Sequence, residues 1–172
     1  MSKAFLITYF LVHFNFAISK VDPPNYDFSL NKFDVFMPGN KLGDIEKVYK
    51  NKELVFKENQ FVTYKFYVSH LRYKFATIVQ FQNGIVTDFY ARLPQYFLHD
   101  IFHQSLINKI GKQDIFKNVD EHSIYIWKNK NNLKHFYAGM CTITCFPIYY
   151  SVKYASKDLG SNYKSLIKKF SD

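Results

Sequence analysis

The 172-residue chain has only two cysteines and two arginines, and its six glycines are scattered singly along it. Without grouped glycines it has no loop of the kind that cradles a phosphate. Arginine makes the bidentate contacts that read phosphates and base edges, so its scarcity argues against nucleic-acid recognition. Beyond the N-terminus, no apolar run reaches the ~20 uncharged residues that a membrane-spanning helix needs. These absences disfavour phosphate-loop enzymes, nucleic-acid readers and integral membrane proteins.

Apolar and aromatic residues are abundant instead. The chain is 48% hydrophobic and contains 14 tyrosines, 19 phenylalanines and one tryptophan. This composition excludes a disordered chain, and the length suits one domain that buries its own core. The formal net charge is +9, and lysine supplies 21 of the 23 basic residues. Such an excess of lysine over arginine is typical of an AT-rich genome, and the alternative is selection for an anionic partner.

The first 19 residues have the three parts of a secretory signal peptide. Lys3 gives a single positive charge, residues 4–16 are mainly apolar, and residues 17–19 (Ala-Ile-Ser) form a small-x-small cleavage site. The alternatives are an uncleaved anchor or a first core strand. His13 and Asn15 interrupt the short apolar part and favour cleavage. We therefore predict an exported protein, periplasmic or secreted, that is not transmembrane after cleavage.

The two cysteines, Cys141 and Cys145, would meet an oxidising compartment after export. In a straight strand, residues four apart are separated by ~13 Å, more than the ~4.4–6.8 Å between the Cα atoms of a disulfide. A bond therefore requires the intervening residues to turn. An internal repeat places a hairpin turn near this position, which predicts a local disulfide. Two buried free thiols in one strand are the alternative.

The repeat is weak but ordered. Shifting the sequence by 61 residues places Tyr64 over Tyr125 and Phe66 over Trp127. Each half starts with apolar residues three and four apart, which is typical of a helix, and continues with strand-like runs. We therefore predict an α+β fold in which two helix-then-antiparallel-meander repeats form one sheet, with the helices packed on one face.

This interpretation divides the chain into a signal peptide (residues 1–19), an extended leader (20–33) and one domain (34–172). The repeat halves cover about 38–93 and 94–155. Asn83-Gly84, between two apolar runs, is typical of a two-residue hairpin turn. Helices are predicted at 42–49, 96–110 and 161–170, and strands at about 53–57, 61–69, 72–82, 85–92, 114–117, 122–128, 133–140 and 147–155.

Three stretches of the first half, residues 39–49, 62–67 and 79–86, follow one another as helix, strand and hairpin. In these stretches the chain resembles the β-lactamase-inhibitor-protein-like fold group, which includes a small lipoprotein of the outer-membrane barrel-assembly machine. The resemblance covers about 55 residues well and the second half loosely. It implies an exported protein that binds another protein and performs no chemistry.

His99 and His103 are the sharpest candidates for a metal site. On a helix, residues four apart share a face, so both imidazoles could reach one ion and support a metal-dependent hydrolase. The alternative is a partly buried edge of the core beside Leu106 and Ile110. Asp100, His70, His122 or His135 could complete the ligand set. The sequence contains no Gly-x-Ser-x-Gly elbow and no CxxC redox motif, so we expect no catalytic residues and no cofactor.

Aromatic and basic residues alternate in three predicted strands, which suggests a Lys/Tyr-rich outer face. The alternative is an ordinary half-solvated sheet with lysine outside. The expected function is an exported non-catalytic module that binds a protein of the bacterial cell envelope; a second reading is attachment to an anionic envelope polymer or membrane surface. Arginine and tryptophan are enriched at binding hot spots, although Trp127 aligns with Phe66 and so favours the core. The candidate surface residues are Arg72, Tyr73, Arg92, Trp127 and Tyr137.

The signal peptide can be tested directly. We expect the natively expressed protein to begin at Lys20, because a small-x-small triplet ends at Ser19. N-terminal sequencing of the purified protein gives the answer, and retention of Met1 would contradict export by this route.

Overall fold

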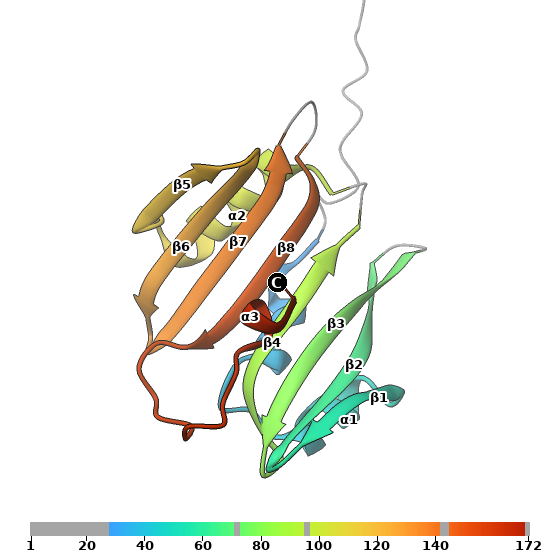
Figure 1. The fold of residues 1–172 in the computed structure, drawn as a ribbon. Helices are drawn as coiled ribbons and strands as arrows, with labels where there is room; N and C mark the ends of the chain where they lie inside the picture. Colours follow the sequence, from blue (N-terminus) through green and yellow to red (C-terminus); the bar gives the residue numbers. More distant parts are fainter. Residues whose placement is uncertain (1–27, 71–72, 95–96, 142–144, 171–172) are drawn as a thin grey trace, which may run out of the picture.

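The structure is a computed structural model that describes residues 28–70, 73–94, 97–141 and 145–170. Eight strands form one antiparallel sheet in the order β1-β2-β3-β4-β8-β7-β6-β5 (Figure 1). Two meanders, β1 to β4 and β5 to β8, therefore meet where β4 pairs with β8. The strands are β1 (Lys52–Glu58), β2 (Phe61–His70), β3 (Tyr73–Gln82), β4 (Ile85–Leu93), β5 (Ile115–Val119), β6 (His122–Lys130), β7 (Leu133–Cys141) and β8 (Cys145–Tyr154).

Several strands are joined by tight turns whose residues adopt left-handed backbone conformations. The φ angles are 51° and 74° at Asn83-Gly84, 47° and 68° at Asp120-Glu121, and 54° and 62° at Asn131-Asn132. Positive φ at both central residues is typical of the two-residue turn whose twist matches the flanking strands. The hairpin predicted at Asn83-Gly84 is confirmed, and the other two turns place β6 beside both of its neighbours.

The helices lie on both faces of the sheet. In Figure 1, η1 (Leu30–Phe36), α1 (Leu42–Val48) and α2 (His99–Ile110) lie behind it, whereas α3 (Leu166–Phe170) lies in front of β4. The prediction that the helices share one face is therefore wrong for the C-terminal helix. The C-terminal helix lies on the other face because β4 has buried side chains on both sides. Phe89 stacks on Phe33 of η1, whereas Tyr90 stacks on Phe170 of α3.

An aromatic core fills the space between the sheet and the three helices behind it. Phe33 is completely buried, and its ring centroid lies 5.5 Å from those of both Phe89 and Tyr150. Phe33 thereby contacts both central strands. Trp127 is also completely buried, and its indole N–H donates a 2.7 Å hydrogen bond to the carbonyl of Gly111. Large rings therefore attach η1 and the end of α2 to the sheet.

The extended leader predicted at residues 20–33 overlaps the first helix of the structure. Residues 30–33 belong to η1, a 3₁₀-helix, because Leu30, Phe33 and Phe36 are spaced by three and so share the buried side of a helix with three residues per turn. The part of the leader before residue 28 lies outside the described residues, as does the predicted signal peptide. The C-terminal helix begins at Leu166 instead of residue 161.

The α+β class is confirmed, and a helix followed by four meandering strands occurs twice, as α1 with β1 to β4 and as α2 with β5 to β8. A duplication as the origin of this order stays a prediction. No helix in the described ranges is long and apolar enough to cross a membrane.

The two cysteines lie at the turn end of the β7–β8 hairpin. The register of β7 and β8 pairs Cys141 with Cys145, which agrees with the predicted turn between them. Their side chains and residues 142–144 lie outside the described part of the chain. The disulfide therefore stays a prediction.

The core packing predicts a large effect of truncating Phe89. Its side chain is fully buried among the rings of Phe33, Phe36 and Tyr150, so Phe89→Ala should lower the free energy of unfolding by about 3–5 kcal/mol. Urea unfolding followed by the fluorescence of the single tryptophan measures this change. Leu54→Ala is the control, because Leu54 is 61% exposed on β1 and its loss should cost within about 0.5 kcal/mol. Equal losses in both variants would contradict the proposed core.

Candidate functional site

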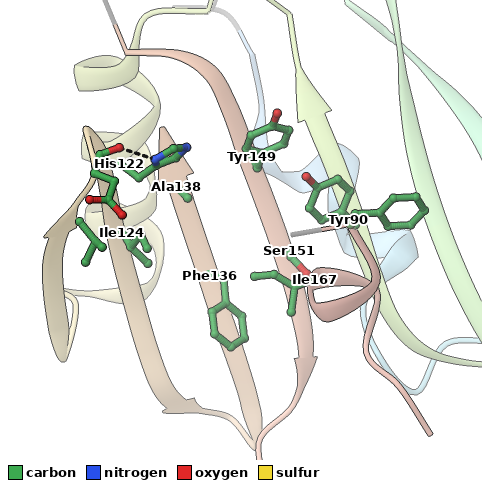
Figure 2. Close-up of a pocket in the computed structure, with 11 residues that line it drawn as sticks. Tyr90, His122, Ile124, Phe136, Ala138, Tyr149, Ser151 and Ile167 are labelled. Atoms are coloured by element: carbon green, nitrogen blue, oxygen red, sulfur yellow. Dashed lines mark hydrogen bonds between the residues drawn. The ribbon is translucent and has the colours of Figure 1, made fainter. Parts of the chain in front are cut away.

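The sheet face that carries α3 contains a groove of about 440 Å³ (Figure 2). Ile124 of β6 and Phe136 and Ala138 of β7 form its floor. α3 lines one side with Ile167 and Phe170, and the turn between β5 and β6 lines the other. Because these strands put their odd-numbered residues into the aromatic core, the even-numbered floor residues must face outward. The groove is therefore an apolar surface that the helices behind the sheet cannot cover.

Three stacked rings form the aromatic side of the groove. The Tyr90 ring lies 5.5 Å from that of Tyr149 and 5.4 Å from that of Phe170, with interplanar angles of 25° and 22°. Phe170 is nevertheless 41% exposed. Stacked tyrosines offer a rigid apolar surface with a polar end at little entropic cost. This side of the groove is suited to contact with apolar or aromatic groups.

The opposite side is polar. Asp120 lies in the left-handed turn before β6, and its carbonyl oxygen is 2.8 Å from Nδ1 of His122. Nδ1 must carry the proton in this contact, because a carbonyl oxygen only accepts. Nε2 of a neutral His122 is then an acceptor, and Figure 2 shows this ring above Ala138. Asp120 also lines the groove, so a carboxylate and an imidazole stand beside its apolar floor.

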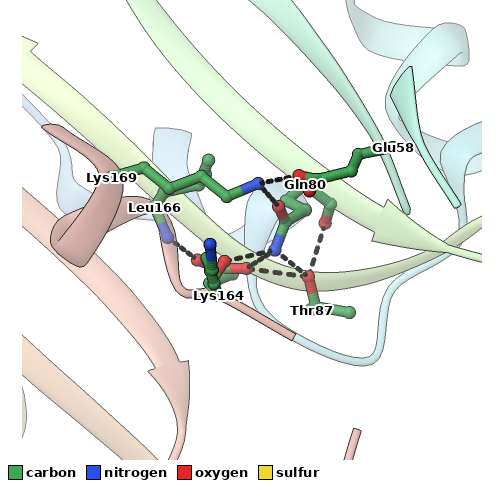
Figure 3. Close-up of polar contacts among 7 residues, drawn as sticks. Glu58, Gln80, Thr87, Lys164, Leu166 and Lys169 are labelled. Carbon is green, nitrogen blue, oxygen red and sulfur yellow. Dashed lines mark hydrogen bonds and ion pairs between the residues drawn. The ribbon is translucent and has the colours of Figure 1, made fainter. Parts of the chain in front are cut away.

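α3 is held in place by a buried carboxylate. Oδ2 of Asp88, on β4, accepts a 2.6 Å hydrogen bond from the backbone N–H of Leu166, and Oδ1 accepts one of 2.7 Å from the Thr87 hydroxyl. The Gln80 amide donates to Asp88 and to the carbonyl of Lys164, both at 3.1 Å. Lys169 contacts Gln80 in turn (Figure 3). Polar contacts from β3 and β4 thus position the helix that lines the groove.

Burial shifts the pKa of Asp88 and of His135 in opposite directions. Burial raises the pKa of Asp88 to about 6, and its hydrogen bonds only partly oppose this. Burial lowers the pKa of His135 to about 4, with a smaller effect of Lys109 in the same direction. His135 lies in the core face of β7, with Nδ1 2.9 Å from the Tyr150 hydroxyl. Both groups are buried and neither lines the groove.

His99 and His103 lie between α2 and the core face of β6 and β7. The two ring nitrogens of His99 are 2.9 Å from the Tyr137 hydroxyl and 3.3 Å from that of Tyr125, and the His103 ring lies 4.0 Å from the Tyr125 ring. Burial lowers the pKa of both histidines. A metal would have to displace a tyrosine from His99, so the geometry favours the alternative of a partly buried core edge.

The other histidines considered for a metal do not join this pair. His70 packs against Phe28 and Phe97, His122 borders the groove, and His135 contacts Tyr150. Among the described residues, no three or more histidines, cysteines, aspartates or glutamates are grouped in a way that could hold a metal ion.

The predicted surface residues have different environments. Trp127 and Tyr137 are completely buried, so they form no exposed binding surface, because alternation along β6 and β7 turns both into the core. Arg92 is exposed and lies opposite Tyr149 in the register of β4 and β8, next to the groove. Arg72 lies outside the described residues, as does the side chain of Tyr73.

Sequence reasoning missed the groove itself. A half-solvated sheet should alternate apolar and polar residues, yet β6, β7 and β8 put Ile124, Phe136 and Tyr149 on the face away from the core. Apolar residues on both faces of neighbouring strands indicate a second covered face, and this signal was present in the sequence.

No family model, no curated protein and no solved structure matches the chain. The resemblance to the β-lactamase-inhibitor-protein-like fold group therefore stays a prediction.

The buried carboxylate predicts a specific pH dependence. The pKa of Asp88 is raised from 3.8 to about 6 in the folded protein, so the folded state binds more protons than the unfolded state between these values. Its contribution to stability is therefore lost as pH rises from about 4 to about 6, by roughly 2–3 kcal/mol. Asp88→Asn removes this loss, so the stability of the variant relative to the natural protein should increase over that interval.

Urea unfolding at a series of pH values measures the difference between the two proteins. Both proteins contain His135, whose lowered pKa makes stability rise with pH. Subtracting one stability from the other removes this shared contribution. A difference that is independent of pH would contradict the assignment of this titration to Asp88.

Proposed function

We propose that the protein is a non-catalytic binding module that takes a segment of another protein in the groove between α3 and the turn before β6. The observation that supports this most is an aromatic-lined groove of about 440 Å³ on the face away from the main core. This volume falls within the ~300–1,000 Å³ of typical ligand sites. The stacked Tyr90, Tyr149 and Phe170 supply side chains enriched in the centre of protein interfaces.

The proposal extends to location. If the chain is exported and cleaved after Ser19, its partner is a protein of the cell envelope. A bond between Cys141 and Cys145 would close the end of the β7–β8 hairpin near Arg92 and Tyr149, because β8 runs from that end toward the groove.

The groove favours a protein partner over the two other candidates. Attachment to an anionic polymer would be served by exposed lysines, but the floor of the groove is apolar and one side carries Asp120. A metal-dependent hydrolase would need His99 to give up a tyrosine contact. Apolar contact also predicts binding that persists in salt, whereas attraction between exposed charges is screened.

One substitution tests the proposal without touching the core. Ala138→Glu places a charge in the centre of the groove floor, on the side of β7 away from the aromatic core. In affinity capture from the native envelope fraction, we expect a protein partner that is retained by the natural protein in about 0.5 M salt and lost by the variant.

Leu54→Glu is the matched control, because it adds the same charge on exposed β1, away from the groove. It should leave capture unchanged, and urea unfolding should show that both variants are folded. Capture that is equal in both variants would contradict the groove as the binding site. Salt-sensitive binding to isolated envelope polymer, with no protein captured, would support the second candidate function.

A further inference from the structure

The charge around the groove changes sign from one end to the other. Asp120 lines the end at the turn before β6, and Glu121 follows it in the same turn. Both are exposed, on a chain whose net charge is +9. An acidic end is therefore a local feature of the groove that opposes the charge of the whole protein.

Beyond Phe136, which lines the other end of the groove, the neighbouring residues of β7 and β8 are basic. The Lys134 amine lies 4.9 Å from the centroid of the Phe136 ring, on the outward side of β7. Lys153 pairs with Lys134 in the register of β7 and β8. Burial lowers the pKa of Lys153 and the nearby charge of Lys134 adds to this, whereas Asp88, its register partner on β4, acts in the opposite direction. Two cationic groups thus stand side by side, and an anion between them would relieve their repulsion.

The register gives the separation of the two ends. His122, at the acidic end, pairs with Met140 of β7, and Lys134 lies six positions earlier on the same strand. At a rise of about 3.3 Å per residue, the ends are about 20 Å apart. An extended segment of about six residues spans this distance, and apolar side chains in its middle would lie over Ile124, Ala138 and Phe136.

We infer that the occupant of the groove is an extended, apolar peptide segment of about six residues, with a basic residue at the end near Asp120 and an acidic residue at the end near Lys134. This inference rests on the proposed function and specifies its partner. The Nε2 atom of a neutral His122 would accept a hydrogen bond from a donor of the segment. Exposed charge pairs contribute little affinity each, so we expect them to select the partner more than to hold it.

Three synthetic peptides serve as probes. Each has blocked ends and the same four apolar residues, including one phenylalanine, between terminal residues that are Lys and Glu, Lys and Lys, or Glu and Glu. NMR titration of the natural protein locates the binding site and gives the affinity. The peptide with one lysine and one glutamate should bind about three- to fivefold more tightly than either other peptide, since one unfavourable end replaces a favourable one.

Two variants should change this ranking in opposite directions. With Asp120→Lys the new lysine is balanced by Glu121, so the Lys/Glu peptide should lose its advantage over the Glu/Glu peptide. With Lys134→Glu the new glutamate is balanced by Lys153, so the Lys/Glu peptide should lose its advantage over the Lys/Lys peptide. The matched controls are Asp44→Lys on α1 and Lys57→Glu on β1, which make the same changes in charge away from the groove. They should leave the ranking of the natural protein unchanged.

The outcomes separate this inference from the proposed function. Equal affinities, or a ranking that follows only the net charge of each variant, would overturn the inference. NMR signals of groove residues that shift with protein concentration alone would also overturn the inference, because the occupant would then be a second copy of this chain. If no peptide binds but Ala138→Glu still loses the captured partner, the inference fails and the proposed function stands. If no peptide binds and that variant also retains every partner, both fail.

Discussion

The ladder between β4 and β8 joins two meanders that have no other strand pairing between them among the described residues. Each meander is held by hairpins, but only this ladder makes a single wide sheet. Its two strands are covered on one side by Phe33 of η1, which contacts both Phe89 and Tyr150. On the other side, Tyr90 contacts Tyr149 and Phe170. The core and the aromatic side of the groove thus lie on opposite faces of the same strand pair.

This arrangement explains why the candidate site lies where it does. Helices that precede each meander cover one face, and the only described helix after the last strand is a five-residue segment on the other. Such a short helix covers β4 but not β6 to β8, so their outward apolar residues remain accessible. Asp88 fixes the position of the helix start, because its carboxylate accepts a hydrogen bond from the backbone N–H of Leu166.

Much of the fold could be predicted from local signals. Turn pairs such as Asn83-Gly84 and alternating apolar residues located the eight strands to within about two residues, because these patterns act over short distances in the chain. The pairing of β4 with β8 depends on residues far apart in sequence, and no local pattern specified it. The buried environments of Tyr137 and Asp88 are also products of tertiary packing. The groove was missed because periodicity was used to find one buried face, whereas these strands have two.

The distance in sequence between β4 and β8 also has a kinetic consequence. Asp88 pairs with Lys153, and Leu93 with Ile148, so the central ladder closes a loop that contains the whole second helix and the three strands before β8. Hairpins form quickly because their contacts are local, whereas a ladder between distant segments must first overcome the entropy of closing that loop. We therefore expect the two meanders to acquire structure before they join. Until they join, the aromatic rings of η1 have only half of their final surroundings, and the groove does not exist.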